Sequence, residues 1–189
     1  NMFLLIQEMI TSKDILAIHD ISDGGLITTL LEMCFTKKIG MNINLSGIDR
    51  VIENLFSEES GFVVQVKQKD AAKIITTFTE KGLAVKEIGH LTNDMFSISK
   101  DDKELFSKSI IELEKIWRET SHAIQSLRDN KEIANSELSL LHNNSFSGLS
   151  SNVNFDESQI KHLSIKSTNP KVAILREQGV NGQNEMAAA

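Results

Sequence analysis

The stretch HDISDGGL, residues 19–26, places two carboxylates, one hydroxyl and two glycines between an apolar run and an amphipathic segment. The run before it, 15–18, has the length of a buried strand, and apolar residues recur at helical spacing through 25–37. These patterns predict a strand, a tight polar turn and a helix. Because a helix N-terminus presents free backbone N–H groups and a partial positive charge, this turn is suited to binding an anion.

The turn also carries the residue types that hold a metal-bound phosphate. Asp20 lies where the strand should end, so its carboxylate can project towards Mg²⁺, which combines one or two carboxylates with waters and phosphate oxygens. Ser22 can hydrogen-bond a phosphate, and Gly24 lets the backbone approach closely. Serine or aspartate before a helix is also an ordinary cap, however, and aspartate and glycine are ordinary turn residues. The residues alone therefore leave a metal–phosphate site and a capped turn both open.

Outward from this turn, short apolar runs alternate with segments of helical periodicity. We expect helices at 4–10, 50–56, 70–81 and 104–128, and strands at 41–45, 62–66, 85–91 and 96–98. The alternation predicts an α/β fold, layered in the α+β sense, with helices packed on a sheet. From residue 129 the pattern decays, and 172–175 has the composition of a further buried strand.

Composition excludes several classes of function. The chain has 189 residues with 40% hydrophobic and 24% charged residues, which is ordinary for a globular protein. Its net charge of −6 argues against a nucleic-acid surface, and no apolar run approaches the length that spans a bilayer. The single cysteine excludes an internal disulfide and fits a reducing cytoplasm. Both ends have the character of cuts, so we expect a fragment of a larger enzyme.

Several segments together resemble a known family. HDISDGGL, the helix after it and SEESGFVVQV at 57–66 resemble the C-terminal half of an aminoimidazole-ribonucleotide-synthetase-type module. WRETSHAIQSLRDN at 117–130 and KVAILREQGVN at 171–181 resemble the end of the synthetase part and the start of the glutaminase domain in the phosphoribosylformylglycinamidine synthase family, in its large single-chain form. The resemblance covers most of 1–130 and 171–189 and is weak between them.

The resemblance implies a domain plan and an activity. It implies a synthetase C-terminal-like domain with a mixed sheet flanked by helices at 1–128, a linker at 129–170, and the first strand and helix start of a class I glutamine amidotransferase at 171–189. The parent enzyme would use ATP to activate formylglycinamide ribonucleotide and ammonia from glutamine to form the amidine. It would be cytoplasmic and would bind neither nucleic acid nor membrane. The fragment would contact other domains of its own chain and could self-associate through surfaces that those domains normally cover.

The resemblance also assigns roles within the turn. It implies that Asp20 is a magnesium ligand and that Ser22 contacts the nucleotide, ATP or ADP, with Asp23 and Gly24 beside it. We expect Asp23 mainly to cap the helix. Because the fragment would come from the second of two synthetase copies, this nucleotide site would be structural. No catalytic residue is expected in the fragment itself.

Other candidates are weaker. Cys34 lies on the apolar face of a predicted helix, so we expect a packed core residue and not a nucleophile. His19 could orient the turn or be purely structural, and the pair Glu58-Glu59 is expected to be structural. A different synthetase-superfamily enzyme, such as a selenophosphate synthetase or thiamine-monophosphate kinase, is an alternative that the REQGVN segment at 176–181 argues against. A docking domain without a nucleotide is the non-enzymatic alternative.

Overall fold

The computed structural model describes residues 2–142, 150–156 and 171–188, and the chain divides into two units, Asn1–Phe146 and Ser147–Ala189. Residues 143–149 and 157–170, which belong to the expected linker, lie outside the described residues. The candidate turn lies in the first unit. No helix among the described residues is both long enough and apolar enough to cross a membrane.

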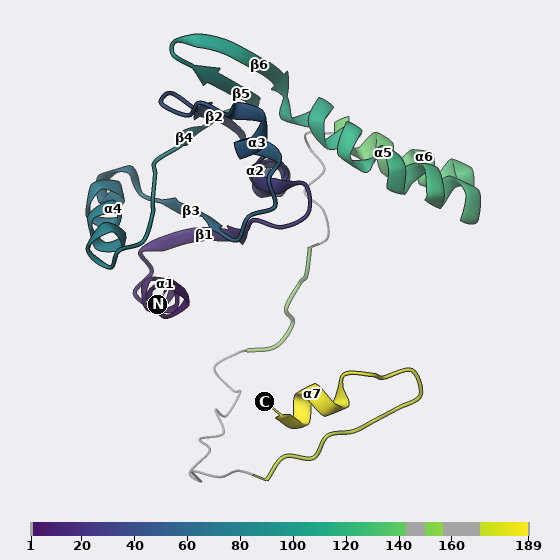
Figure 1. Cartoon of the computed structure of the whole chain (residues 1–189). Coiled ribbons are helices and arrows are strands. Elements are labelled where there is room, and N and C mark those ends of the chain that lie inside the picture. The colour runs from purple at the N-terminus through teal and green to yellow at the C-terminus, as the bar shows by residue number, and fades with distance from the viewer. Residues whose placement is uncertain (1, 143–149, 157–170, 189) are drawn as a thin grey trace. The chain divides into compact units, whose positions relative to one another are not determined.

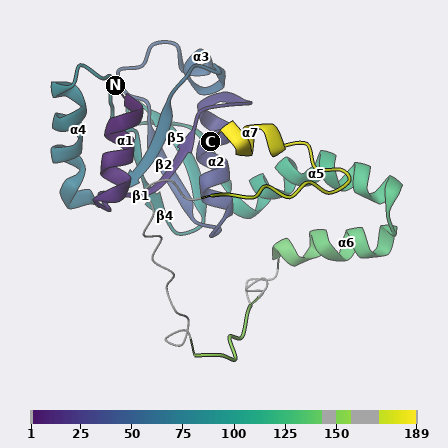
Figure 2. The ribbon, with the colours of Figure 1, turned by 90° about the horizontal axis from the view of Figure 1, so that it is seen from below.

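One layer of the first unit is a two-stranded antiparallel ribbon covered by two helices. The ribbon pairs β1 with β3, and it is covered by α1 and α4, which lie beside each other in Figure 2. The bounds are Met2–Thr11 for α1, Ile15–Asp20 for β1, Phe62–Val66 for β3 and Ala71–Glu80 for α4, with the short 3₁₀ turn Gln68–Asp70 before α4. Their apolar faces form one hydrophobic core, whose buried members are Leu5, Ile6, Met9, Ile15, Ile74 and Phe78.

The other layer is a four-stranded mixed sheet in the order β4-β2-β5-β6. Strands β2 and β5 run parallel, while the β2–β4 and β5–β6 pairs are antiparallel, which confirms the expected mixed sheet. The bounds are Gly40–Asn44 for β2, Gly89–Thr92 for β4, Met95–Lys100 for β5 and Lys103–Ser109 for β6. Strand β4 is shorter than the predicted 85–91 because its pairing with β2 starts only at Gly89.

Three helices flank this sheet and close the main core. They are α2 (Gly25–Phe35), α3 (Val51–Phe56) and α5 (Ile110–Arg128). The fully buried members of this core come from α2, β2, the residue after it, β5 and α5; they are Leu30, Cys34, Ile43, Leu45, Phe96 and Ile110. The α/β class and the helices flanking a sheet are therefore confirmed.

The predicted helix 104–128 is wrong in its first part. Residues Lys103–Ser109 form β6, and the helix begins only at Ile110. The hairpin turn before β6 uses Asp101 and Asp102 with φ of 49° and 63°, the positive values that a tight two-residue hairpin needs. Ser109 then starts α5 with a capping box, in which its hydroxyl accepts from the Glu112 N–H and the Glu112 carboxylate accepts in return.

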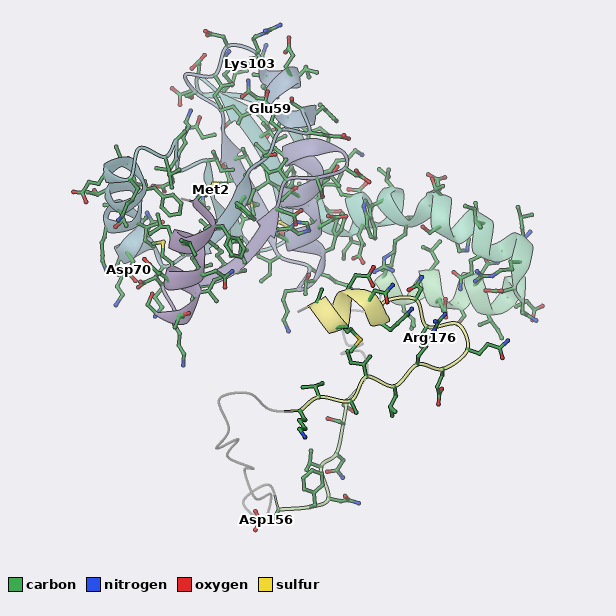
Figure 3. The ribbon with its side chains drawn as sticks, turned by 60° about the horizontal axis from the view of Figure 1, so that its bottom comes forward. Met2, Glu59, Asp70, Lys103, Asp156 and Arg176 are labelled. Carbon is green, nitrogen blue, oxygen red and sulfur yellow. The ribbon has the colours of Figure 1, made fainter. Side chains whose placement is uncertain are left out.

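Beyond α5 the chain turns back into α6, Lys131–Ser139, and the 3₁₀ turn Leu140–His142. Asn130 caps α6 by accepting from two backbone N–H groups, and Figure 1 shows α5 and α6 side by side. In the second unit, 172–175 forms no strand although its composition predicts one, since a strand needs a partner to pair with. The short helix α7, Gln183–Ala188, follows; Figure 3 marks Arg176 in the loop before it.

Candidate functional site

Strand pairing brings two distant segments to the candidate turn. Because β1 and β3 are antiparallel, Asp20 at the end of β1 lies opposite Phe62 at the start of β3. The Ile21 N–H continues the pairing and donates to the Gly61 carbonyl at 2.9 Å. The SEESG segment, whose Glu59 is labelled in Figure 3, therefore borders HDISDGGL directly.

Asp20 combines a hydrogen-bonded backbone with a largely exposed carboxylate, whose Oδ1 lies 3.5 Å from Nδ1 of His19. Its carbonyl oxygen lies 3.1 Å from the buried Thr29 hydroxyl, which donates to it, and 2.7 Å from Nδ1 of His19. Its side chain is 65% exposed. The structure therefore places the Asp20 carboxylate at the end of β1, as the sequence predicts, in a position that ions in solution can reach.

The helix N-terminus differs from the expected one. Gly24, and not Asp23, occupies the N-cap of α2, with φ of 81°, and no side chain caps the helix. The Gly24 N–H instead donates to Oε1 of Glu58 at 3.0 Å. The expectation that Asp23 caps α2 is therefore wrong, because a left-handed glycine starts the helix and a carboxylate from another segment accepts the N–H. Glu58 is also well placed to interact with the positive end of the helix dipole.

The two glycines serve local packing. An added Cβ at Gly24 would collide with the Thr28 side chain, and one at Gly25 would lie 2.7 Å from the Phe56 backbone. Gly25 also adopts φ of 73° and donates its N–H to the Ser22 carbonyl at 2.9 Å. Their small size thus lets α2 approach α3 and close the turn.

The predicted site residues stay together in one exposed turn, but they do not form a complete cage. Ser22 and Asp23 are exposed beside Asp20. Within residues 2–142, 150–156 and 171–188, no three His, Cys, Asp or Glu side chains converge so as to hold a metal ion. Asp20 as one accessible carboxylate fits Mg²⁺, which is usually held by one or two carboxylates, waters and phosphates rather than by an all-protein cage.

Three supporting residues were missed from sequence: Thr29 beneath Asp20, Glu58 at the helix N-terminus, and Glu32, whose Oε2 lies 3.2 Å from Nε2 of His19. Glu58 was expected only to be structural. No spacing rule connects positions 24 and 58, since strand pairing brings them together. For Thr29, a polar residue on the buried face of a predicted helix was the available signal.

Cys34 is confirmed as a core residue. It is 1% exposed, and burial raises the pKa of its thiol to about 11. The thiolate is the nucleophilic form of cysteine, so this thiol stays protonated and unreactive at neutral pH.

We expect Glu58→Ala to lower the free energy of unfolding by about 0.5–1.5 kcal/mol, since the Gly24 N–H loses its acceptor. Urea denaturation of the purified chain would measure the change. Glu59→Ala removes the same charge from the neighbouring exposed position and should change stability by less than about 0.5 kcal/mol. Equal effects of the two substitutions would contradict the role given to Glu58.

Part of the first unit matches a known family in sequence and known structures in fold. Residues 1–100 match the family described as AIR synthase related protein, C-terminal domain. Structures of Thermotoga maritima PurL complexed with ATP, with FGAR and with AMPPCP each give a TM-score of 0.50, at identities of 14%, 16% and 15%. They cover 55%, 56% and 55% of this chain, and the chain spans 19% of each of theirs. At these identities the likeness is one of fold.

Proposed function

Because this chain belongs to the family of the AIR synthase related protein, C-terminal domain, we propose that it is part of a phosphoribosylformylglycinamidine synthase. The synthetase-type domain that HDISDGGL and its flanks predicted is confirmed by the family match and the fold. The similar PurL chains are about three times longer, and the matched part spans 19% of each, so the activity of a whole enzyme belongs to the proposal.

The proposed parent is an ATP-dependent C–N ligase with glutamine as nitrogen donor. ATP would activate the formyl-amide oxygen of formylglycinamide ribonucleotide, and ammonia would displace phosphate to give the amidine, ADP and phosphate. Support comes from the fold that this chain shares with PurL proteins described as complexed with ATP and with FGAR. The domain plan 1–128, 129–170 and 171–189 and a cytoplasmic location are part of the same proposal.

The observation that carries the site is the exposed carboxylate of Asp20 on a backbone fixed by Thr29 and His19. Mg²⁺ bound there would offset the charge of a nucleotide phosphate. Ser22 and Asp23 are exposed beside it, and the Gly24 backbone closes the turn. The Gly24 N–H is already used by Glu58, so phosphate contacts in this proposal come from Mg²⁺ and from Ser22 rather than from that N–H.

Binding of Mg·ADP to Asp20→Asn tests this proposal. We expect the variant to bind Mg·ADP at least tenfold more weakly by calorimetry, because one charged metal ligand is lost, and to unfold at the same temperature. Asp49→Asn removes the same charge at another exposed position and should bind like the unchanged chain. With EDTA present, Asp20→Asn and the unchanged chain should bind ADP equally. An unaltered Mg·ADP affinity in Asp20→Asn would overturn the proposal.

A further inference from the structure

The four-stranded sheet of the first unit ends in an open edge. Strand β6, Lys103–Ser109, is last in the order β4-β2-β5-β6, so it pairs with β5 on one side only. Figure 1 shows it on the outer side of β5, and no other strand among the described residues pairs with it. An edge strand presents backbone N–H and C=O groups that can pair with a strand of another molecule.

This edge offers more to a partner strand than the opposite edge of the sheet. Strand β6 has seven residues, whereas β4 has four and begins with Gly89, which has no side chain to pack against a partner. Within β6, Leu105 has no partner residue on β5, because the register shifts there, and it is 46% exposed. A partner strand on β6 would therefore gain the longer backbone pairing and would cover an exposed leucine.

The charged side chains of β6 are complementary to a second copy of the same strand. Phe106 is the middle residue of β6, with Glu104 two residues before it and Lys108 two residues after it. When two copies of β6 pair antiparallel about Phe106, Glu104 of each copy lies directly opposite Lys108 of the other. Opposite charges at such positions stabilise a strand pair, and like charges destabilise it.

Both charges are available for this pairing. Glu104 and Lys108 are exposed, and neither belongs to a salt bridge within the described part of the chain. Shifting the antiparallel register by one residue would place Lys103 of one copy opposite Lys108 of the other. The register that pairs the whole of β6 is thus also one that brings opposite charges together.

The same register covers the exposed leucine. Pairing about Phe106 places Leu105 of each copy opposite Ser107 of the other, so the two Leu105 side chains become diagonal neighbours across the symmetry axis. Diagonal neighbours on paired strands lie within reach of long side chains. Backbone, charged and apolar groups of β6 are therefore satisfied together by one occupant, a second copy of β6.

We propose that β6 is an interface between two copies of this chain, which pair antiparallel about Phe106 and join their four-stranded sheets into one. The same patch is used on both copies, so the association closes at a dimer and leaves no β6 edge free. The interface is independent of the proposed nucleotide site, because Asp20 lies at the end of β1 in the other layer.

Sedimentation of the purified chain tests the pairing. We expect a dimer at concentrations on the order of 100 µM that dissociates on dilution to about 1 µM, since one pair of strands makes a small interface. A chain that stays monomeric over this range would overturn the proposal. Species larger than a dimer would also overturn it, because two β6 edges that pair with each other cannot add a third copy.

Charge reversal tests the register. Glu104→Lys and Lys108→Glu each place like charges at both opposed positions of a dimer, and we expect either variant alone to dimerise at least tenfold more weakly. An equimolar mixture of the two variants restores opposite charges at both positions. The mixture should dimerise within about threefold of the unchanged chain, which would also show that both variants fold.

Matched controls make the same charge reversals away from β6. Glu80→Lys and Lys73→Glu lie at exposed positions of α4, in the other layer, and each should dimerise like the unchanged chain. A dimer that persists in Glu104→Lys and in Lys108→Glu would place the interface on another face and overturn the proposal. Failure of their mixture to regain the dimer would overturn the antiparallel register about Phe106.

Discussion

Phe96→Ala is expected to lower the free energy of unfolding by about 3–5 kcal/mol, the range measured when a large core aromatic is truncated. Phe96 is 0% exposed and lies in β5, an interior strand of the four-stranded sheet. It is opposite Met41 on the parallel strand β2 and Lys108 on β6. Its ring joins the core that α2 and α5 close over the sheet, so no single element can move to refill the space.

Urea denaturation followed by circular dichroism would measure this loss. Phe3→Ala is the matched control, because it removes the same ring from a position on α1 that is 61% exposed. We expect the control to change stability by less than about 1 kcal/mol. A loss below about 1 kcal/mol for Phe96→Ala would contradict the packing of α2 and α5 on the sheet.

Local patterns predicted the part of the fold that carries the candidate site. The apolar run 15–18 and the helical spacing of 25–37 correspond to β1 and α2, and the polar residues between them form the turn. These signals distinguish the two elements because a short apolar run is typical of a buried strand, whereas apolar residues at a spacing of three to four are typical of a helix with one buried face. The position of Asp20 at a strand end follows from that pattern alone.

Nonlocal pairing explains what sequence patterns missed. The run 104–109 carries Leu105 and Phe106 directly before a long segment of helical periodicity, so the sequence pattern predicts that the helix includes this run. The structure pairs Phe106 with Ile98 of β5 instead, after a turn at Asp101 and Asp102. Two consecutive aspartates with positive φ are an uncommon hairpin signal, and only the partner strand resolves the ambiguity.

The candidate site likewise combines features that local sequence patterns predict with contacts that they do not predict. The residue types of the turn were evident from sequence, but their supports come from elsewhere in the chain. Glu58 accepts the Gly24 N–H at the start of α2 because β3 returns beside β1, and Glu32 on α2 reaches His19 on β1. A helix cap is normally expected from the residue directly before the helix. Here strand pairing brings in a residue that is distant in the sequence to accept the N–H.

Gly25→Ala is expected to lower the free energy of unfolding by about 2–5 kcal/mol, for two separable reasons. The backbone at Gly25 has φ of 73°, which costs a residue with a Cβ about 1–2 kcal/mol. The added Cβ would also lie 2.7 Å from the Phe56 backbone and 2.9 Å from the Leu55 carbonyl oxygen. Backbone atoms cannot rotate away as a side chain can, so overpacking adds about 1–3 kcal/mol.

Gly82→Ala separates the two reasons. Gly82 also has a positive φ, of 70°, but an added Cβ there meets no atom within 4 Å. Gly82→Ala should therefore lower the free energy of unfolding only by the cost of the backbone conformation, about 1–2 kcal/mol. Urea denaturation of both variants would give the difference, which measures the close approach of α2 to the end of α3. Equal losses would show that α3 moves freely away from α2. A larger loss at Gly25 would show that this glycine fixes the start of α2, and therefore the position of the Asp20 turn, by contact with α3 as well as by its conformation.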